Sequence, residues 1–273
     1  MWCKTCNIET NEDLCPVCGS ATIEDIPTEV YWCAHCETPV IQAATQADKG
    51  FCPLCKRKMK YLSADLRPVF PEERLLLELL LGEKPFTYVE KSVWAANSRY
   101  YINGKSVSIP SKTFQEADTD ALSKMLEQNK GQNTYEYFDK HIASFINTNK
   151  LRLHYLKDEA YTFIKKAAEK YDEEHIVLSF SGGKDSTVTA DIVIKTLGNP
   201  SLVHIFGDTT LEFPSTIEYA TRYRKNHPLA IFQVAKNREQ IFYDVCEDIG
   251  PPARMMRWCC SMFKTGPITR VIN

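Results

Sequence analysis

Residues 181–187 read Ser-Gly-Gly-Lys-Asp-Ser-Thr; they follow a short apolar run, residues 176–180, and lead into a helix-like segment from about 184 to 197. The two glycines let the backbone approach a ligand closely because they carry no Cβ atom. Backbone N–H groups at the start of a helix, together with the Lys184 ammonium, form a site for an anion. The stretch therefore predicts a phosphate-binding loop between a strand and a helix.

The polar side chains of this loop have separate expected roles. The hydroxyls of Ser181, Ser186 and Thr187 are donors for phosphate oxygens. A carboxylate beside phosphates is unfavourable because both are negatively charged. Asp185 is therefore expected to orient the loop or to hold Mg²⁺. The loop is not a Walker loop, which has four residues between its glycines and then Lys-Ser/Thr. The alternative is a glycine turn without a ligand.

Strands and helices alternate after residue 175. Apolar runs at 202–206 and 229–234 predict two further strands, and helices are expected over about 214–226 and 237–247. Such alternation is typical of βαβ units in which helices cover both faces of a parallel sheet. The expected fold class is therefore α/β, with a parallel, doubly wound, Rossmann-like sheet in the C-terminal domain.

Eight of the eleven cysteines form four Cys-x-x-Cys pairs within the first 55 residues. Each pair offers two sulfurs from one tight turn, and four thiolates satisfy tetrahedral zinc. We expect two zinc ribbons with sequential ligand sets: Cys3, Cys6, Cys15 and Cys18 for one ion, and Cys33, Cys36, Cys52 and Cys55 for the other. A cross-braced arrangement stays open, and a redox role for one pair is disfavoured because no βαβ pattern surrounds it.

The zinc modules have two interpretations. Zinc allows a segment too small for a core to fold, which is a purely structural role. The alternative is that the modules bind a nucleic acid or a protein, because a basic cluster (Lys56, Arg57, Lys58 and Lys60) follows the last ligand. The aromatic residues expected to stack on bases are Trp2, Tyr31, Trp32 and Phe51. Against this, acidic residues outnumber basic ones in residues 1–62.

The region between the modules and the loop contains no chemical motif. Pro71 begins an expected helix that Gly82 ends, and Asn103-Gly104 predicts a tight β-hairpin turn. A long helical stretch covers about 134–170, with a break expected near 147–149. We expect three parts: the zinc-ribbon modules at 1–62, an α+β middle region at 63–150, and a helical lead-in with the phosphate-loop domain at 151–273.

Three stretches together resemble the phosphoadenosine phosphosulfate (PAPS) reductase family. The loop matches the Ser-Gly-Gly-x-Asp-Ser signature of the PP-loop superfamily, to which that family belongs. Residues 207–214 resemble the family's Asp-Thr-Gly-x-x-Phe-Pro-Glu-Thr stretch, although Thr210 stands where glycine is common and Ser215 where glutamate is common. Residues 254–264 resemble its Arg-x-Cys-Cys-x-x-x-Lys stretch.

The resemblance implies a set of site residues. The loop would bind the β,γ-pyrophosphate of ATP, and Asp208 at the end of a strand would reach nucleotide or metal, with a helix cap as its alternative role. The catalytic candidates are Lys184, Asp185, Asp208 and Arg257. The nucleotide-binding candidates are Ser181, Gly182, Gly183, Lys184, Asp185, Ser186, Thr187, Asp208, Arg254, Arg257 and Lys264. The implied cofactors are ATP, Mg²⁺ and two Zn²⁺.

The resemblance covers residues 175–273 and looks cut short, so the chain is expected to be a fragment or to be completed by another chain. In iron–sulfur members of the family a cysteine pair supplies two of four cluster ligands. Cys259 and Cys260 resemble that pair, and Cys246 is the one other cysteine outside the zinc modules. An iron–sulfur cluster is therefore expected only with ligands from outside this chain, and the alternative is a buried or metal-linked structural pair.

The intact loop favours the branch of the family that splits ATP. Our leading hypothesis is an enzyme that adenylates a substrate in sulfur transfer or nucleic-acid thiolation, with tRNA or DNA and a sulfur-donor protein as candidate partners. The alternatives are a thiol-dependent reductase of adenylyl sulfate or PAPS, and a non-catalytic nucleic-acid-binding or scaffold subunit. The formal net charge of −2 argues against a protein coated in nucleic acid, although it leaves room for local basic patches. The lack of a long apolar run and the N-terminal sequence predict a cytoplasmic protein without a membrane contact, which could form oligomers.

Overall fold

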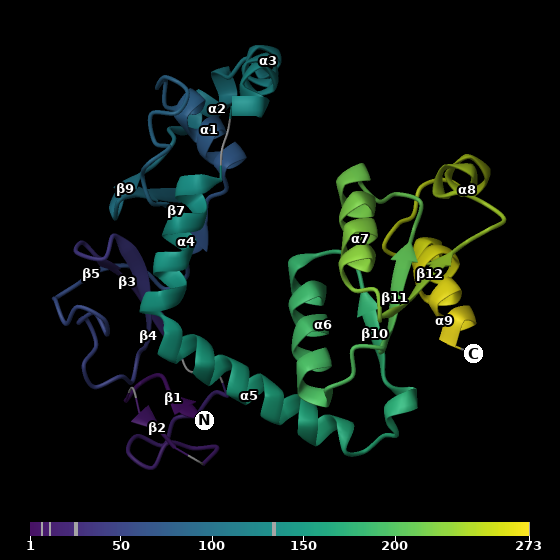
Figure 1. Cartoon of the computed structure of the whole chain (residues 1–273), viewed down its shortest axis with the longest axis horizontal. Helices are drawn as coiled ribbons and strands as arrows, with labels where there is room; N and C mark the ends of the chain where they lie inside the picture. The colour runs from purple at the N-terminus through teal and green to yellow at the C-terminus, as the bar shows by residue number, and fades with distance from the viewer. Residues whose placement is uncertain (7, 11, 25–26, 133–134, 273) are drawn as a thin grey trace. The chain divides into compact units, whose positions relative to one another are not determined.

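The computed structural model describes residues 1–6, 8–10, 12–24, 27–132 and 135–272. Its internal contacts divide the chain into two compact units, an N-terminal unit (Met1–His154) and a C-terminal unit (Tyr155–Asn273). Each unit has its own sheets and its own core (Figure 1). None of the helices in the described residues is long and apolar enough to cross a membrane.

The C-terminal unit is built on a parallel sheet with the strand order β10-β11-β12. The strands are β10 (Val177–Phe180), β11 (Val203–Asp208) and β12 (Ile231–Lys236). In register, Phe180 pairs with Phe206, and Asp208 pairs with Lys236. The carboxyl ends of all three strands therefore lie at one edge of the sheet, where ligands bind in open α/β folds.

Helices cover both faces of this sheet, as the doubly wound fold class predicts (Figure 1). The helices of the unit are α6 (Lys184–Leu197), α7 (Pro214–Asn226), α8 (Phe242–Ile249) and α9 (Gly266–Ile272), with short turns η2 (Glu173–His175) and η3 (Cys260–Thr265). Ala190 of α6 and Tyr223 of α7 pack into the core with Phe180. On the sheet, α9 contacts β11 and β12.

The core of this unit contains a fully buried histidine. The Nδ1 atom of His204 lies 2.8 Å from the Leu202 carbonyl oxygen, and its Nε2 atom lies 3.4 Å from the Tyr223 hydroxyl. Burial lowers the pKa of His204, which keeps the imidazole neutral. His204 is therefore part of the packing rather than of a reaction site.

Most of the expected elements of this unit are present with small shifts. Helices α6 and α7 have the predicted bounds, whereas β12 begins and ends two residues later than the apolar run 229–234. The helix expected at 237–247 begins at Phe242, because Asn237 first forms a turn in which its Oδ1 accepts from the N–H groups of Glu239 and Gln240. The η3 turn is a π-helix that the sequence did not predict.

The N-terminal unit begins with two small sheets around the cysteine pairs. Strands β1 (Trp2–Cys3) and β2 (Ile8–Glu9) pair antiparallel, and a second antiparallel sheet has the order β4-β3-β5. Its strands are β3 (Thr28–Cys33), β4 (Thr38–Ala43) and β5 (Lys60–Ser63). The last four residues of β3 are all buried, which reflects its run of Val, Tyr, Trp and Cys.

A four-stranded antiparallel sheet follows in the order β6-β7-β8-β9. Its strands are β6 (Arg67–Pro68), β7 (Val93–Ala96), β8 (Arg99–Ile102) and β9 (Lys105–Val107). The predicted hairpin turn between β8 and β9 is confirmed, since Asn103 and Gly104 have φ of 47° and 74°. A Cβ atom on Gly104 would overlap the ring of Trp32, so this turn also packs tightly against β3.

The helices of the N-terminal unit follow the predicted pattern in part. They are α1 (Pro71–Leu80), α2 (Ser111–Glu116), α3 (Thr119–Asn129), η1 (Lys130–Gln132), α4 (Glu136–Thr148) and the start of α5 (Lys150–Ala168). Proline begins α1 and Gly82 follows its end with φ of 74°, as expected. The long stretch is two helices that meet at Asn149; residue 134, where we expected it to begin, lies outside the described residues.

Asn149 anchors this junction to β4. Its side chain accepts from the Ile41 N–H at 2.7 Å and donates to the Pro39 carbonyl at 3.0 Å and the Phe145 carbonyl at 2.8 Å. The residue is 3% exposed, so its removal would leave buried backbone groups without partners.

Asn149→Ala is therefore expected to lower the free energy of unfolding by about 1–3 kcal/mol. Urea unfolding followed by tryptophan fluorescence measures this, since three of the four tryptophans lie in residues 1–154. Asn147→Ala, two residues away and exposed, is the matched control and should change little. Equal midpoints for the two variants would contradict the anchoring role.

Candidate functional site

The predicted phosphate loop joins β10 to α6. Gly183 is the N-cap of α6, a helix of 14 residues whose positive dipole end points back at the loop. Gly182 has φ of 74°, which favours glycine, and a Cβ atom there would lie 3.2 Å from the Thr216 Cγ2 atom of α7. The backbone conformation therefore favours glycine at position 182, and the space beside Thr216 is tight for a larger residue.

Hydroxyl groups inside the loop fix its shape. Ser186 Oγ donates to the Gly183 carbonyl at 3.0 Å and accepts from the Ser181 N–H at 3.2 Å, while Ser181 Oγ donates to Ser186 Oγ at 3.1 Å. Thr187 Oγ1 donates to the Gly183 carbonyl at 2.9 Å and accepts from the Tyr219 hydroxyl at 3.0 Å. The side chains we expected to bind phosphate thus form the bonds that preorganise the loop, and Tyr219 is a supporting residue that sequence reasoning missed.

The two charged side chains of the loop are exposed. Neither Lys184 nor Asp185 makes a side-chain hydrogen bond or ion pair with any residue in the part of the chain that the structure describes. A lysine at the N-terminus of a helix lies against the unfavourable end of the dipole, which an anion would offset. The loop therefore combines a preformed shape with an uncompensated positive charge.

Asp208 lies at the end of β11 and is held by two contacts. Its Oδ2 atom is 3.0 Å from the Lys236 ammonium, and its Oδ1 atom accepts from the Thr210 N–H at 2.9 Å. The Asp208 side chain is 16% exposed and that of Lys236 is 45% exposed. Sequence reasoning missed Lys236, because the strand that ends with it was expected to stop two residues earlier. The structure thus places a second lysine at the edge of the sheet where the loop lies.

Thr210 occupies the position where the resembled family often has glycine, and the backbone conformation at this position explains that preference. Its φ is 66°, a conformation that β-branched residues rarely adopt. The Thr210 Oγ1 atom accepts from the Phe242 N–H at 2.9 Å, which helps to hold this strained turn against the start of α8. The departure from glycine therefore keeps the local backbone conformation and adds one hydrogen bond.

The basic residues of the Cys-Cys stretch lie on exposed turns. Arg254 lies within a tight turn closed by two hydrogen bonds between Ala253 and Met256, Arg257 directly follows this turn, and Lys264 is on η3. The η3 turn contacts β11 and β12, so the stretch packs against the same sheet as the phosphate loop. A Cβ atom on Gly266 would overlap the Ser261 carbonyl oxygen, so the π-helix requires that glycine. Such bulges often occur at functional sites.

Cys259, Cys260 and Cys246 are free and half-buried. Within the described residues, the groups of side chains that could hold a metal ion are the two four-cysteine clusters of the N-terminal unit. The cysteine pair of the C-terminal unit is in neither. The described residues therefore supply no complete iron–sulfur ligand set around Cys259 and Cys260.

The eight N-terminal cysteines form the sequential grouping that we expected. The sulfurs of each group all lie within 4.8 Å of one another. Neighbouring sulfurs lie 3.5 Å apart for Cys3 and Cys18, and 3.9 Å apart for Cys36 and Cys52. A tetrahedron of sulfurs about 2.3 Å from zinc has edges of about 3.8 Å, so both clusters fit this ion. Zinc here would have a structural role, since four ligands leave no open position.

The burial of the aromatic residues corrects one expectation. Trp2, Tyr31 and Trp32 are 5%, 9% and 7% exposed, so they are not available for stacking on bases. Trp32 packs with Trp94, and Tyr31 packs around the second cysteine cluster. Of the four candidates only Phe51, at 48% exposed, remains accessible.

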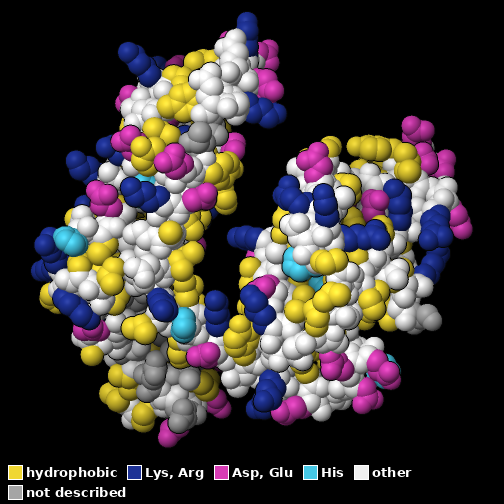
Figure 2. Space-filling view, in the orientation of Figure 1, with side chains coloured by type: hydrophobic (Ala, Val, Ile, Leu, Met, Phe, Trp, Pro, Cys, Tyr) yellow, Lys and Arg dark blue, Asp and Glu magenta, His cyan; other side chains and the backbone are white. Residues whose placement is uncertain are grey.

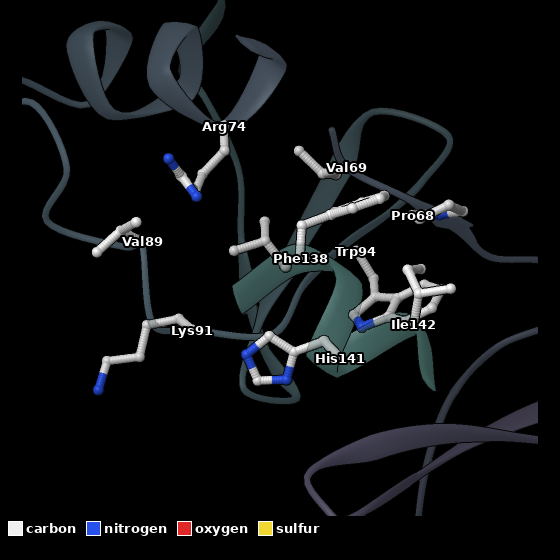
Figure 3. A pocket seen from close by; sticks show the side chains of 10 residues that line it. Pro68, Val69, Arg74, Val89, Lys91, Trp94, Phe138, His141 and Ile142 are labelled. Atoms are coloured by element: carbon white, nitrogen blue, oxygen red, sulfur yellow. The ribbon is translucent and has the colours of Figure 1, made fainter. Parts of the chain in front are cut away.

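A small pocket in the N-terminal unit lies where α1, β7 and α4 meet (Figure 3). Arg74 reaches toward it from α1, and His141 and Phe138 line it from α4. His141 Nε2 lies 3.1 Å from the Glu90 carbonyl oxygen, and Arg74 Nε lies 3.5 Å from Glu78. Arg74 and His141 are thus engaged in contacts within the unit, and the lining of the pocket suggests no reaction.

The parallel doubly wound sheet, with a phosphate loop after its first strand, defines a Rossmann-like α/β domain. Residues 175–273 match the family model of the phosphoadenosine phosphosulfate reductase domain. This segment therefore belongs to the PAPS reductase family of the PP-loop superfamily, as its motifs predicted.

Two relatives are uncharacterized proteins of Methanocaldococcus jannaschii. One is 34% identical over 138 residues, which is 50% of this chain and 32% of that protein. The other is 30% identical over 139 residues, which is 51% of this chain and 28% of that protein. The chain thus matches a third or less of the length of these relatives, and their names suggest no activity.

Proposed function

We propose that this protein binds Mg-ATP at residues 181–187 and transfers the adenylyl group to an acceptor, with release of pyrophosphate. The observation that carries this proposal is the loop itself: it is intact, its shape is held by its own hydroxyls, and Lys184 has no partner among the described residues. An ordered loop with an uncompensated lysine at a helix N-terminus is suited to the pyrophosphate part of a nucleotide.

In the proposed reaction a nucleophilic oxygen of the acceptor attacks the α-phosphorus. The bond from that phosphorus to the bridging oxygen of the β-phosphate breaks, and the electron pair leaves with pyrophosphate. Lys184 and the N–H groups at the start of α6 stabilise the negative charge that develops on the leaving group. A sulfur donor can then displace AMP from the adenylated acceptor, which would place the enzyme in sulfur transfer or nucleic-acid thiolation.

The carboxylates near the loop suit Mg²⁺, which would neutralise phosphate charge. Asp208 is already bound to Lys236 and to a backbone N–H, whereas the Asp185 side chain has no partner among the described residues. Asp185 is therefore the better ligand candidate. Asp208 is a positioning residue in this proposal, because it fixes the ammonium of Lys236 at the end of β12.

The family match favours one alternative activity, the thiol-dependent reduction of adenylyl sulfate or PAPS. That reaction needs a nucleophilic cysteine, and the candidates Cys246, Cys259 and Cys260 are half-buried. Reduction of a sulfated nucleotide does not require pyrophosphate to leave, so it gives no reason for an intact ATP-type loop. We therefore place adenylation first.

Isothermal titration of the zinc-loaded chain separates these functions. We expect binding of Mg-ATP at least tenfold tighter than binding of adenylyl sulfate or PAPS. A preference for either sulfated nucleotide, with sulfite release in the presence of a thiol, would replace adenylation with reduction. Binding of none of the three would contradict both activities for this chain by itself and favour a scaffold role.

A further inference from the structure

The second cysteine cluster carries a basic face that the first lacks. Between Asp48 and Asp65 the sequence has no acidic residue, and four of the five residues from 56 to 60 are lysine or arginine. Lys56, Arg57, Lys58 and Lys60 are all exposed. Their side chains make no ion pair or hydrogen bond with the residues that the structure describes. Their positive charge is therefore available to a partner.

Two exposed aromatic rings lie among these cations. Phe51 and Lys58 are antiparallel bridge partners, so their side chains are neighbours. Tyr61 is 52% exposed, and its ring meets the buried Tyr31 ring edge-on at 5.7 Å between centroids. In Figure 2, Lys and Arg side chains gather with hydrophobic ones over the region where Figure 1 labels β5. The face thus combines charge with flat apolar surface.

The backbone under this face is well ordered by hydrogen bonds. The Cys52 N–H donates to the Arg57 carbonyl at 2.9 Å, the Lys56 N–H donates to the Cys52 carbonyl at 2.9 Å, and the Met59 N–H donates to the Gly50 carbonyl at 2.7 Å. These bonds tie the cationic segment to the cysteine cluster. A bound partner would therefore lose little affinity to the ordering of this segment.

The first cluster provides an internal comparison. Both clusters contain a Cys-Pro-x-Cys turn, residues 15–18 and 52–55, with an exposed apolar residue at the tip: Val17 is 71% exposed and Leu54 is 53% exposed. The tip is thus a shared feature of the turn. The residues that follow differ, since Gly-Ser-Ala comes after Cys18 and Lys-Arg-Lys after Cys55. The basic charge is an addition that the turn itself does not need.

We propose that the face formed by Phe51, Lys56, Arg57, Lys58, Lys60 and Tyr61 binds a single-stranded segment of nucleic acid. The cations contact the phosphates, and the two rings stack on bases, the combination that single strands prefer. An acidic protein would use the charge but has no comparable use for two exposed rings beside it. Binding to this face requires no ATP, so it does not depend on the proposed function. Only the further step, in which the bound nucleic acid is the acceptor for adenylation, rests on the proposed function.

Fluorescence anisotropy with a labelled 15-nucleotide poly(U) RNA tests the binding, on the zinc-loaded full chain without ATP. Neutralising four phosphate contacts predicts a log–log salt slope of about −3, or a loss of about 50-fold in affinity between 50 and 200 mM salt. Phe51→Ala and Tyr61→Ala are each expected to weaken binding by about 5- to 150-fold. A Lys56→Gln, Arg57→Gln, Lys58→Gln triple variant should remove most of the salt dependence.

The control is Lys4→Gln, which removes a cation from the first cluster and should leave affinity within twofold. A zinc count for each variant shows that its clusters remain formed. The proposal is overturned if RNA binding is absent, is equal in the triple variant with both ions present, or is matched by duplex RNA. Displacement of the RNA by polyglutamate at equal charge would also overturn it, in favour of an acidic protein partner. Lys184→Ala should impair adenylation but leave RNA binding by this face intact. A failure of the RNA-binding proposal can therefore be distinguished from a failure of the adenylation proposal.

Discussion

Replacement of Lys184 by alanine is expected to lower the rate of ATP–pyrophosphate exchange by about 10²–10³-fold, the cost of removing one preorganised donor from a developing oxyanion. The lysine is the first residue of α6, and its side chain is exposed and has no partner among the described residues. Its removal should therefore leave the loop conformation unchanged. The variant should therefore have a lower rate of ATP–pyrophosphate exchange but the same unfolding transition as the parent chain.

Lys195→Ala is the matched control for this variant. Lys195 lies on the same helix and forms an exposed ion pair with Asp191 at 2.7 Å, a kind of pair that contributes little to stability because solvent screens it. The control therefore removes the same charge from α6 at a distance from the loop, and we expect its exchange rate to stay within twofold of the parent chain. Full activity in Lys184→Ala would remove the assigned role of the lysine, and equal losses in both variants would indicate a general effect of charge.

The parts of the fold that could be predicted from sequence are those fixed by local chemistry. The glycines and polar residues of 181–187 specify the loop, Gly198 in the left-handed conformation ends α6, and Asn103-Gly104 specifies its hairpin turn. Each cysteine pair lies within a four-residue turn, and the sequential clusters need only the next pair along the chain. In each case the signal and its structural result lie within a short stretch.

The rest depends on contacts between distant residues. Lys236 pairs with Asp208 because β12 extends two residues beyond its apolar run, an extension set by pairing with β11. Tyr219 reaches Thr187 across 32 positions. Tyr31 and Trp32 are aromatic residues near a cysteine pair, and this position in the sequence is compatible with either exposed or buried side chains. Their burial follows only from the pairing of β3 with β5. Which face of a strand is buried is a tertiary property that no single residue type encodes.

The same limit applies to the roles of the loop hydroxyls. Ser181 and Ser186 were predicted to donate to phosphate because they stand in a phosphate-loop pattern. In the structure they bond to each other and to the loop backbone. A hydroxyl has one proton to donate, so a serine that supports the loop cannot also donate to a phosphate without giving up that bond. The pattern identifies the loop, whereas its geometry decides which donor remains for a ligand.

Removal of zinc is expected to unfold the segment around the second cysteine cluster. Cys33 and Cys52 are fully buried and pack with Tyr31, Val40 and Met59, so the cluster is itself the core of this sheet. Zinc binding to small cysteine domains contributes an apparent free energy of about 10–16 kcal/mol at pH 7. A segment with so small a core has no comparable source of stability.

Cys33→Ser is therefore expected to reduce bound zinc from two ions per chain to one, and to make residues 28–63 sensitive to a protease that leaves the parent chain intact. Zinc per chain is measured with a metal-sensitive dye, and the cleavage sites by mass spectrometry. Cys246→Ser changes a half-buried cysteine outside both clusters; it is the control and should keep two ions.

Cys15→Ser should also lose one ion yet leave residues 28–63 resistant, because the sequential clusters share no ligand. Loss of both ions in either cluster variant would contradict the independence of the two clusters. Protease resistance of the metal-free chain would show that the β4-β3-β5 sheet stays folded without zinc.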